Sequence, residues 1–300
     1  MNHWDGRSRG SPLGYRIFGI VLRLVGVWPA YLLLWPVSLY FLLVASGARR
    51  ASLSFFRERL DISGMKAIRM TWRQFFRFGQ TIIDRAAVVS GRNNLFRFTF
   101  DGEEHLVKMS EDGKGGLIIG AHVGNWNISA HFLTRIPGKM AVLLYDDEWE
   151  NVKKALSEIE GKPLGEGKVI FIPIKDDLSH LVRLKEILNS GGLVAIHGDR
   201  YRPGNRTLEV SFLGAPARVP AGPFLLAASL DLPVTFSVAL KESTYRYHLY
   251  ARPPVNYYRL TGIIREKANQ CARDFFSWLE PYVRRHPDQW YNFYDFWKRS

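Results

Sequence analysis

The stretch that decides the fold runs from residue 117 to residue 126 and reads LIIGAHVGNW. Its first three residues, Leu117 to Ile119, are apolar and predict a short buried strand, because strands covered on both faces have continuous apolar runs. His122 follows almost at once, and the Gly124-Asn125 pair is typical of a turn. In open α/β sheets, ligands gather at the carboxyl ends of the strands. His122 is therefore the first candidate for a catalytic residue.

The same alternation of short apolar runs and helical segments continues along the chain. Apolar runs lie at 117–119, 141–145, 168–172, 193–196 and 233–239. Helices are expected at 51–90, 124–135, 147–160, 176–190, 221–230 and 261–285, and a further strand at 94–102. This alternation predicts an α/β fold, a mostly parallel sheet flanked by helices.

The N-terminal part of the chain holds a long uncharged run. Residues 24–47 contain no Asp, Glu, Lys or Arg, and about 20 apolar residues suffice to cross a bilayer core. We expect a basic segment at 1–16, a membrane anchor at 17–50 and a catalytic domain at 51–300. The excess of basic residues beyond the run favours a body on the cytoplasmic side of the inner membrane. A buried hairpin of two short helices is the alternative for the uncharged run.

The overall charge indicates an anionic partner. The formal net charge is +13, which suits a membrane face, an acidic protein or a nucleic acid. The basic residues are scattered and no nucleic-acid-binding motif is present, so binding to nucleic acid is not expected. The only cysteine is Cys271, and no HExxH sequence occurs. These features exclude an internal disulfide and argue against a metal site.

A second group of polar residues follows the apolar run 193–196. The motif HGDR spans residues 197–200, and the basic loop YRPGNR follows it. Because the carboxyl ends of parallel strands meet at one edge of a sheet, Asp199 and Arg200 are expected near His122.

These blocks together carry a resemblance to a known family. GAHVGNWNISAHF (residues 120–132), HGDR, VSFLGAPARVPAGPFLLAASLDLPV and HPDQWYNFYDFW occur in that order. They resemble the blocks of the lipid A late-acyltransferase and lysophospholipid acyltransferase superfamily, whose first block has the spacing His-x4-acid. The resemblance covers about residues 20 to 297 and implies a glycerolipid acyltransferase-like fold.

The resemblance implies an acyltransferase that uses His122 as its general base. The donor would be an acyl carrier protein or coenzyme A thioester, and no other cofactor and no metal are implied. The acceptor would be a hydroxyl or amine of a membrane lipid, such as a lipid A precursor, a lysophospholipid or an amino acid lipid. Arg200, or backbone N–H groups just after His122, would stabilise the oxyanion. Residues expected to contact substrate are Gly124, Asn125, Trp126, Arg202 and Arg218.

The chain departs from the family at the acid of the first block. The fifth residue after His122 should be Glu or Asp, and it is Asn127. An amide brings no charge to stabilise an imidazolium, and a comparable change in a serine protease costs about 10⁴ in kcat. Three interpretations stay open: a slow enzyme, a catalytically impaired lipid-binding relative, natural or engineered, or an enzyme in which Asp199 supplies the carboxylate. If the missing acid is the defect, Asn127→Glu should raise activity.

Overall fold

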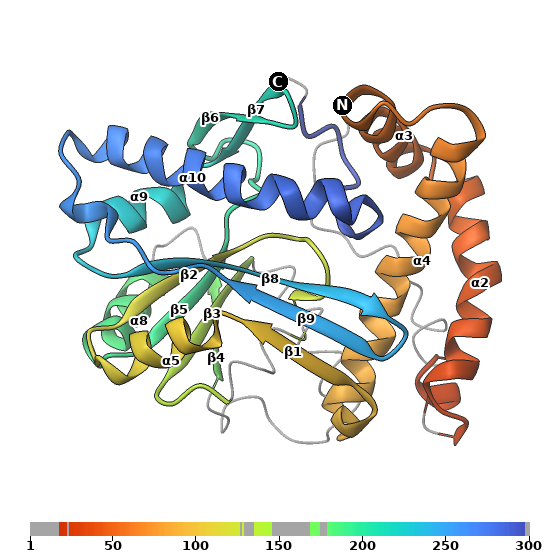
Figure 1. The fold of residues 1–300 in the computed structure, drawn as a ribbon, viewed down its shortest axis with the longest axis horizontal. Coiled ribbons are helices and arrows are strands. Elements are labelled where there is room, and N and C mark those ends of the chain that lie inside the picture. The colour runs from red at the N-terminus through yellow and green to blue at the C-terminus, as the bar shows by residue number, and fades with distance from the viewer. Residues whose placement is uncertain are drawn as a thin grey trace.

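The computed structural model describes residues 18–22, 24–126, 128, 135–145, 169–174 and 179–297. In this part of the chain helices cover a central sheet, and the N-terminal helices stand against one end of it (Figure 1). The strands of the central sheet are β1 (Arg97–Asp101), β2 (Gly116–Gly120), β3 (Met140–Tyr145), β4 (Val169–Ile174), β5 (Leu193–His197), β8 (Val234–Ser243) and β9 (Arg246–Ala251). Their order is β1-β9-β8-β2-β5-β3-β4.

Neighbouring strands in this sheet run parallel except where β8 meets β9. The connection between β8 and β9 is only residues 244–245, and a loop this short can join only antiparallel strands. The prediction of an α/β fold with a mostly parallel sheet flanked by helices is confirmed.

Side chains of β2 alternate between the two faces of the sheet. Leu117 and Ile119 join a core cluster that contains residues of α9 (Gly222–Ser229) and α10 (Ile264–Arg285). Ile118 joins a second cluster with Met109 of α5 (Glu103–Glu111). Figure 1 shows α9 and α10 across one face of the sheet. This covering of both faces explains why the apolar run in the sequence is unbroken.

The other expected helices agree with the structure in place and differ at their ends. Segment 176–190 contains α8 (Ser179–Asn189), and segments 221–230 and 261–285 contain α9 and α10. The predictions at 1–16 and 147–160, and most of the helix expected at 124–135, lie outside the described residues.

Three strands and one α-helix of the described residues were not expected from the sequence. The strands β6 (Thr207–Phe212) and β7 (Ala215–Pro220) form a separate hairpin, β9 pairs with β8, and the helix α5 follows β1. The hairpin turns at Leu213 (φ 52°) and Gly214 (φ 78°). Positive φ at both positions is typical of the tightest hairpin turns. Leucine seldom adopts this conformation, so the sequence carried a weak turn signal.

The segment expected to be helical at 51–90 forms two helices, α3 (Ser46–Leu60) and α4 (Gly64–Val89). The break falls at Asp61, which has the left-handed φ of 54° that commonly ends a helix. Phe55 and Phe56 of α3 are buried in the main core cluster. The N-terminal helices are thereby packed onto the α/β body.

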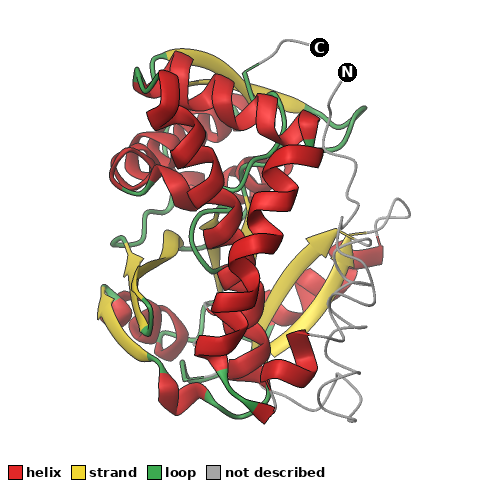
Figure 2. Ribbon diagram, turned by 90° about the vertical axis from the view of Figure 1, so that its right-hand side faces the viewer, coloured by secondary structure: helices red, strands yellow, loops and turns green. Residues whose placement is uncertain are grey.

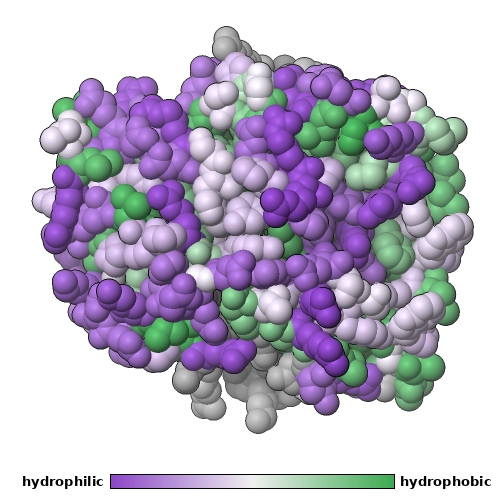
Figure 3. Space-filling model, in the orientation of Figure 1, coloured by the Kyte–Doolittle hydropathy of each residue, from purple (hydrophilic) through white to green (hydrophobic). Residues whose placement is uncertain are grey.

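Helix α2 (Val27–Val44) lies beside α4, in front of the sheet in the view of Figure 2. Its buried side chains are Val27, Ala30, Tyr31, Leu34, Ser38 and Leu42. Its opposite side exposes Trp28, Leu32, Trp35, Leu39, Tyr40 and Leu43. In Figure 3, hydrophobic residues lie along the right-hand edge, where Figure 1 places α2. By length and composition α2 suffices to cross a membrane, a test that some soluble core helices also pass.

Candidate active site

The candidate site lies where β2 and β5 end side by side. Gly120 of β2 is paired in parallel register with His197 of β5. His122 and Asp199 each follow their strand by two residues. Because the last residues of the two strands are paired and each side chain follows two positions later, both side chains lie at the same level at the carboxyl edge of the sheet. The structure therefore brings together two residues that are 77 positions apart in the chain.

His122 and Asp199 make a buried contact at two points. The ring Nδ1 lies 2.8 Å from Asp199 Oδ1, and the backbone N–H of His122 donates to Oδ2 at 2.9 Å. The side chains are 3% and 0% exposed. An ionised carboxylate only accepts hydrogen bonds, so it keeps the ring proton on Nδ1 and leaves the lone pair on Nε2. This is the tautomer that a general base requires.

The Asp199 carboxylate is held in its charged form. Burial alone would raise its pKa, but the charge and hydrogen bond of His122, together with the charges of Arg200 and His197, hold the pKa of Asp199 well below its usual range. Asn292 Nδ2 also donates to Oδ2 at 3.1 Å. The stability that this lowered pKa contributes is present above the ordinary carboxyl value of about 3.9 and is lost as the pH falls below it.

The His122 ring packs between two other rings. Its centroid lies 4.8 Å from that of Trp126, in an edge-on arrangement, and 4.3 Å from that of His197. Trp126 contacts His197 in turn, with centroids 6.1 Å apart. This packing restrains rotation of the catalytic candidate. His197 belongs to the HGDR motif, and its place at the end of a predicted strand was visible in the sequence, but no role was predicted for it.

Residues near the C-terminus hold the backbone around His122. The N–H of Tyr291 donates to His122 O at 3.0 Å, and the N–H of Gly124 donates to Gln289 O at 2.8 Å. These two bonds pair the tail with the turn that follows β2. Gln289 belongs to a short 3-10 helix, η3 (Pro287–Gln289), directly after α10.

Asn292 and Tyr294 are two residues of the site that sequence reasoning did not identify. Asn292 bridges two other site residues, because its Nδ2 donates to Asp199 and its Oδ1 accepts from Arg200 Nε at 2.8 Å. The Tyr294 hydroxyl donates to the backbone oxygen of Asp199 at 3.2 Å. The tail HPDQWYNFYDFW was noticed for its resemblance, yet nothing in its spacing indicates contact with a residue over 90 positions earlier.

Gly124 and Asn125 shape the turn from within the protein. A side chain at Gly124 (φ 65°) would place its Cβ 1.9 Å from Ala239 O, so only glycine fits. The Asn125 N–H donates to Ala239 O at 2.7 Å, and the Asn125 side chain is buried, with Oδ1 accepting from Ile128 N–H at 3.2 Å. The N–H groups of these two residues are therefore occupied and do not face an oxyanion. Substrate contact by either residue stays a prediction.

Arg200 is half-buried and points its guanidinium along the C-terminal tail. Its Nη2 donates to Tyr291 O at 2.9 Å, and its Nε donates to Asn292 Oδ1. These bonds hold a planar cation beside the His122–Asp199 pair, and a guanidinium is suited to an anionic oxygen.

The other residues predicted for the site are less closely connected to it. Arg202 lies over the ring of Tyr145, with its Cζ 4.8 Å from the centroid. Arg218 belongs to β7, in register with Glu209 of β6, and so lies on the separate hairpin. Asn127 lies outside the described residues. Roles for these three residues stay predictions.

Comparison with known proteins assigns the chain to a family. The family model for bacterial lipid A biosynthesis acyltransferases matches residues 63–299. No match was found among curated proteins. Among solved structures, the chain is similar to the crystal structure of the 1-acyl-sn-glycerophosphate (LPA) acyltransferase PlsC from Thermotoga maritima. That similarity has 12% identity and a TM-score of 0.39, over 85% of this chain and 97% of that chain.

Proposed function

The chain belongs to the bacterial lipid A biosynthesis acyltransferase family, and from this premise we propose that it transfers a fatty acyl group from a thioester to a membrane lipid. The observation that carries the proposal is the buried hydrogen bond of 2.8 Å between His122 Nδ1 and Asp199 Oδ1. It supplies a histidine of defined tautomer at the ligand-binding edge of the sheet.

The proposed reaction begins with proton removal by His122. Its Nε2 accepts the proton of the acceptor hydroxyl or amine, and the freed lone pair attacks the thioester carbonyl carbon. The tetrahedral intermediate collapses by breaking the C–S bond, and the thiolate leaves. The imidazolium returns its proton to that sulfur, so the products are an acylated lipid and a free thiol.

Asp199 is proposed to perform the role that the family assigns to the acid of the first block. Its carboxylate holds the Nδ1 proton and stabilises the imidazolium that forms during the reaction. Catalysis then does not require an acid at residue 127. An enzyme served by Asp199 is favoured over an impaired relative because the carboxylate is buried, ionised and hydrogen-bonded to the ring.

Arg200 is proposed to stabilise negative charge on the substrate side. The tail already fixes its Nε and Nη2, so its orientation is set before substrate binds. A preorganised donor contributes about 10²- to 10³-fold to kcat in comparable oxyanion sites. With the Gly124 and Asn125 N–H groups occupied, Arg200 is the favoured donor, either to the oxyanion or to a lipid phosphate.

The proposed substrates follow from the family and the charge. The donor is an acyl carrier protein or coenzyme A thioester, and both are anionic partners suited to a net charge of +13. The acceptor is a lipid A precursor, a lysophospholipid or an amino acid lipid. Purified protein in mixed micelles should transfer a labelled acyl chain to one of these acceptors, and mass spectrometry of the lipid product identifies it.

The decisive control for this assay is His122→Ala. Turnover by the wild-type protein that His122→Ala loses supports acyl transfer at this site. A wild-type protein that binds acyl thioester without turning over any acceptor would instead favour the impaired lipid-binding relative, which the presence of Asn127 suggests. Product formation that survives His122→Ala would exclude His122 as the base.

The exposed side of α2 is proposed to hold the protein on the inner membrane with its catalytic domain in the cytoplasm. Leu32 and Leu43 are 60% and 66% exposed there, an arrangement that suits contact with lipid. The double variant Leu32→Glu/Leu43→Glu should lose flotation with vesicles. Val182→Glu, at a 63% exposed site on α8, is the matched control and should float like wild type. Equal flotation of all three proteins would exclude this anchor.

A further inference from the structure

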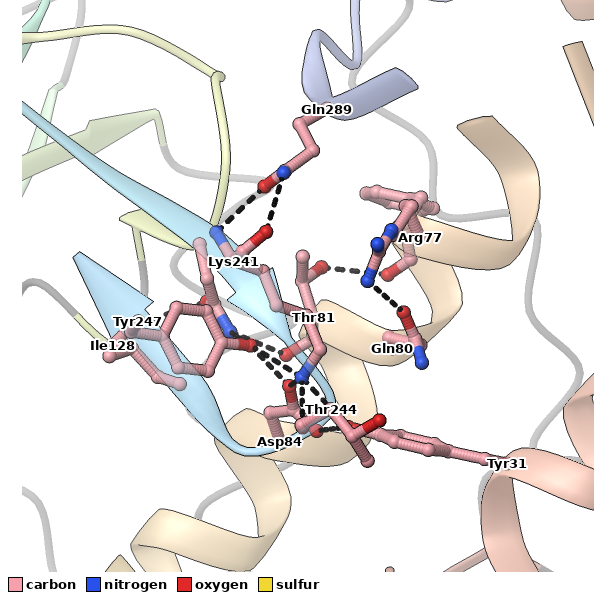
Figure 4. Close-up of polar contacts among 12 residues, drawn as sticks. Tyr31, Arg77, Gln80, Thr81, Asp84, Ile128, Lys241, Thr244, Tyr247 and Gln289 are labelled. Carbon is pink, nitrogen blue, oxygen red and sulfur yellow. Dashed lines mark hydrogen bonds and ion pairs between the residues drawn. The ribbon is translucent and has the colours of Figure 1, made fainter. Parts of the chain in front are cut away.

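A second cluster of polar side chains is buried outside the active site, between α2, α4, β8 and β9 (Figure 4). Lys241 of β8 and Asp84 of α4 form an ion pair in it, and their side chains are 1% and 0% exposed. The Lys241 ammonium also donates to the backbone oxygen of Thr244 at 2.8 Å. Burial lowers the pKa of Lys241 and raises that of Asp84. Pairs this deeply buried seldom add stability over apolar packing, so another role is expected.

Tyr31 connects this cluster to α2. Its hydroxyl donates to Asp84 Oδ1 and accepts from Lys241 Nζ at 2.9 Å. Tyr31 lies on the side of α2 that faces the protein, directly opposite the exposed apolar side. It also lies outside the matched family segment 63–299, whereas its two partners lie inside it. The cluster therefore keeps all of its hydrogen bonds only when α2 is packed against the rest of the domain.

Two connections run from the same cluster to the turn after His122. The Tyr247 hydroxyl donates to Asp84 and accepts from Asn125 Nδ2 at 3.2 Å. This is a direct side-chain path from the ion pair to the turn.

The second connection uses the backbone of Lys241. Its N–H donates to Gln289 Oε1 at 2.9 Å, and its carbonyl accepts from Gln289 Nε2 at 2.8 Å. The carbonyl of Gln289 then accepts the N–H of Gly124. The side chain and the backbone of one residue, Lys241, thus lead to adjacent residues of the active-site turn.

We propose that Tyr31 is a positioning residue, and that through the Lys241–Asp84 cluster the seating of α2 sets the geometry of the turn that carries His122. In kinetic terms the inference rests on the acyl transfer proposed above. The physical content is a coupling: when α2 lifts, Asp84 and Lys241 lose a partner and Tyr247 reorients. The Asn125 amide then loses one of its two acceptors and keeps only the backbone oxygen of Thr81, 3.3 Å away. Because such coupling is reciprocal, an ordered turn also favours a seated α2.

The test compares two conservative changes of a tyrosine. Tyr31→Phe removes the buried hydroxyl of α2, and Tyr258→Phe, at a 46% exposed residue of the short 3-10 helix η2 (Tyr257–Arg259), is its matched control. Losing the two hydrogen bonds of this hydroxyl should speed amide hydrogen exchange at residues 122–126 by about 5-fold or more, in Tyr31→Phe only. Both variants should bind phosphatidylethanolamine–phosphatidylglycerol vesicles like wild type. Unchanged exchange in Tyr31→Phe would overturn the proposal.

Kinetics supply an independent arm of the same test. Tyr31→Phe should lower kcat by about 10-fold with KM within about twofold, because a misplaced base slows chemistry more than binding. Equal kcat in Tyr31→Phe and Tyr258→Phe contradicts the inference. If the wild-type protein shows no acyl transfer, the proposed function fails alone, and the exchange measurement still decides the coupling.

A third variant examines the path itself. Tyr247→Phe removes the hydroxyl that joins Asp84 to Asn125, and it should speed exchange at residues 122–126 as Tyr31→Phe does. Because both changes act on one path, the double variant should show little more than the larger single effect. Additive effects would show that Tyr31 does not act through Tyr247. Tyr247→Phe also keeps the path testable if Tyr31→Phe fails to fold.

Discussion

Two aspartates whose side chains are fully buried, Asp199 and Asp84, each pair with a basic partner, and the two pairs differ in what surrounds them. Asp199 meets His122 at the carboxyl edge of the sheet, with Arg200 close by, and its pKa is lowered. Asp84 meets Lys241 between helices and strands, and there burial dominates and raises the pKa of the carboxyl. The number of nearby positive charges, more than the depth of burial, separates the two.

This difference teaches how one kind of residue serves two purposes. At the sheet edge, a carboxylate kept ionised can stabilise an imidazolium that appears and disappears during a reaction. In the helix–sheet cluster, a lysine and a carboxyl joined by two tyrosine hydroxyls can only specify one arrangement of the elements around them.

The largest expected effect is on activity, from loss of the carboxylate beside the histidine. Asp199→Asn should lower kcat by about 10⁴-fold, because an amide favours the wrong tautomer and brings no charge. Asp84→Asn should keep KM near wild type and reduce kcat far less. Steady-state kinetics on both proteins provide the measurement. Similar losses in the two variants would erase the distinction between the pairs.

The next largest effect should be a loss of stability when the Lys241–Asp84 pair is broken. Lys241→Met leaves the Asp84 carboxyl without its cation and should reduce the free energy of unfolding by about 3–5 kcal/mol. Adding Asp84→Asn should recover part of that loss. Denaturant unfolding measures both. A Lys241→Met protein as stable as wild type would show that the pair contributes no specific contact.

Arg200→Ala should reduce kcat/KM by about 10²-fold, the scale of one preorganised donor. Arg200→Lys should restore activity only in part, since an ammonium lacks the planar fork that reaches both Tyr291 and Asn292. Circular dichroism checks that both proteins fold. Full activity in a folded Arg200→Ala protein would limit the site to His122 and Asp199.

The pH dependence of activity should also distinguish Asp199 from Asp84, through a smaller effect. The base must be neutral to act, and the Asp199 charge favours the protonated ring. The activity that remains in Asp199→Asn should therefore extend to lower pH than that of wild type, because the ring stays neutral at a lower pH. Asp84→Asn should leave the pH dependence of activity unchanged. If the acid limb of the pH–activity profile shifts in Asp84→Asn but not in Asp199→Asn, then Asp84, and not Asp199, acts on the ring of His122.

The smallest effect should come from Asn127→Glu. The sequence alone suggested a large gain, because the first block lacks its acid. Since His122 already bonds to Asp199, we now expect less than about a threefold change in kcat/KM. A gain of about 10² or more would show that Asp199 does not serve as the acid. Asn127→Gln is the size-matched control for the added charge.

Local patterns determined a large part of this protein. Apolar runs placed the strands β2, β3, β4, β5 and β8, because a strand covered on both faces is mostly apolar. The block following β2 identified His122, and HGDR identified Asp199 and Arg200, because the end of a parallel strand is a place where polar residues meet ligands. The family resemblance rested on the order of these blocks. The family model that matches residues 63–299 confirms the resemblance.

The sequence by itself thus determined the fold class and the family, and it predicted His122 as the base. Only the tertiary structure decided which acid lies beside His122, since the parallel register of Gly120 with His197 brings Asp199 to the ring. The tertiary structure also decided that Asn292 bridges Asp199 to Arg200, and that Tyr31 of α2 reaches a buried ion pair. These contacts join residues 53 to 93 positions apart. No periodicity or spacing along the chain encodes which distant side chains meet, because that depends on how whole elements pack.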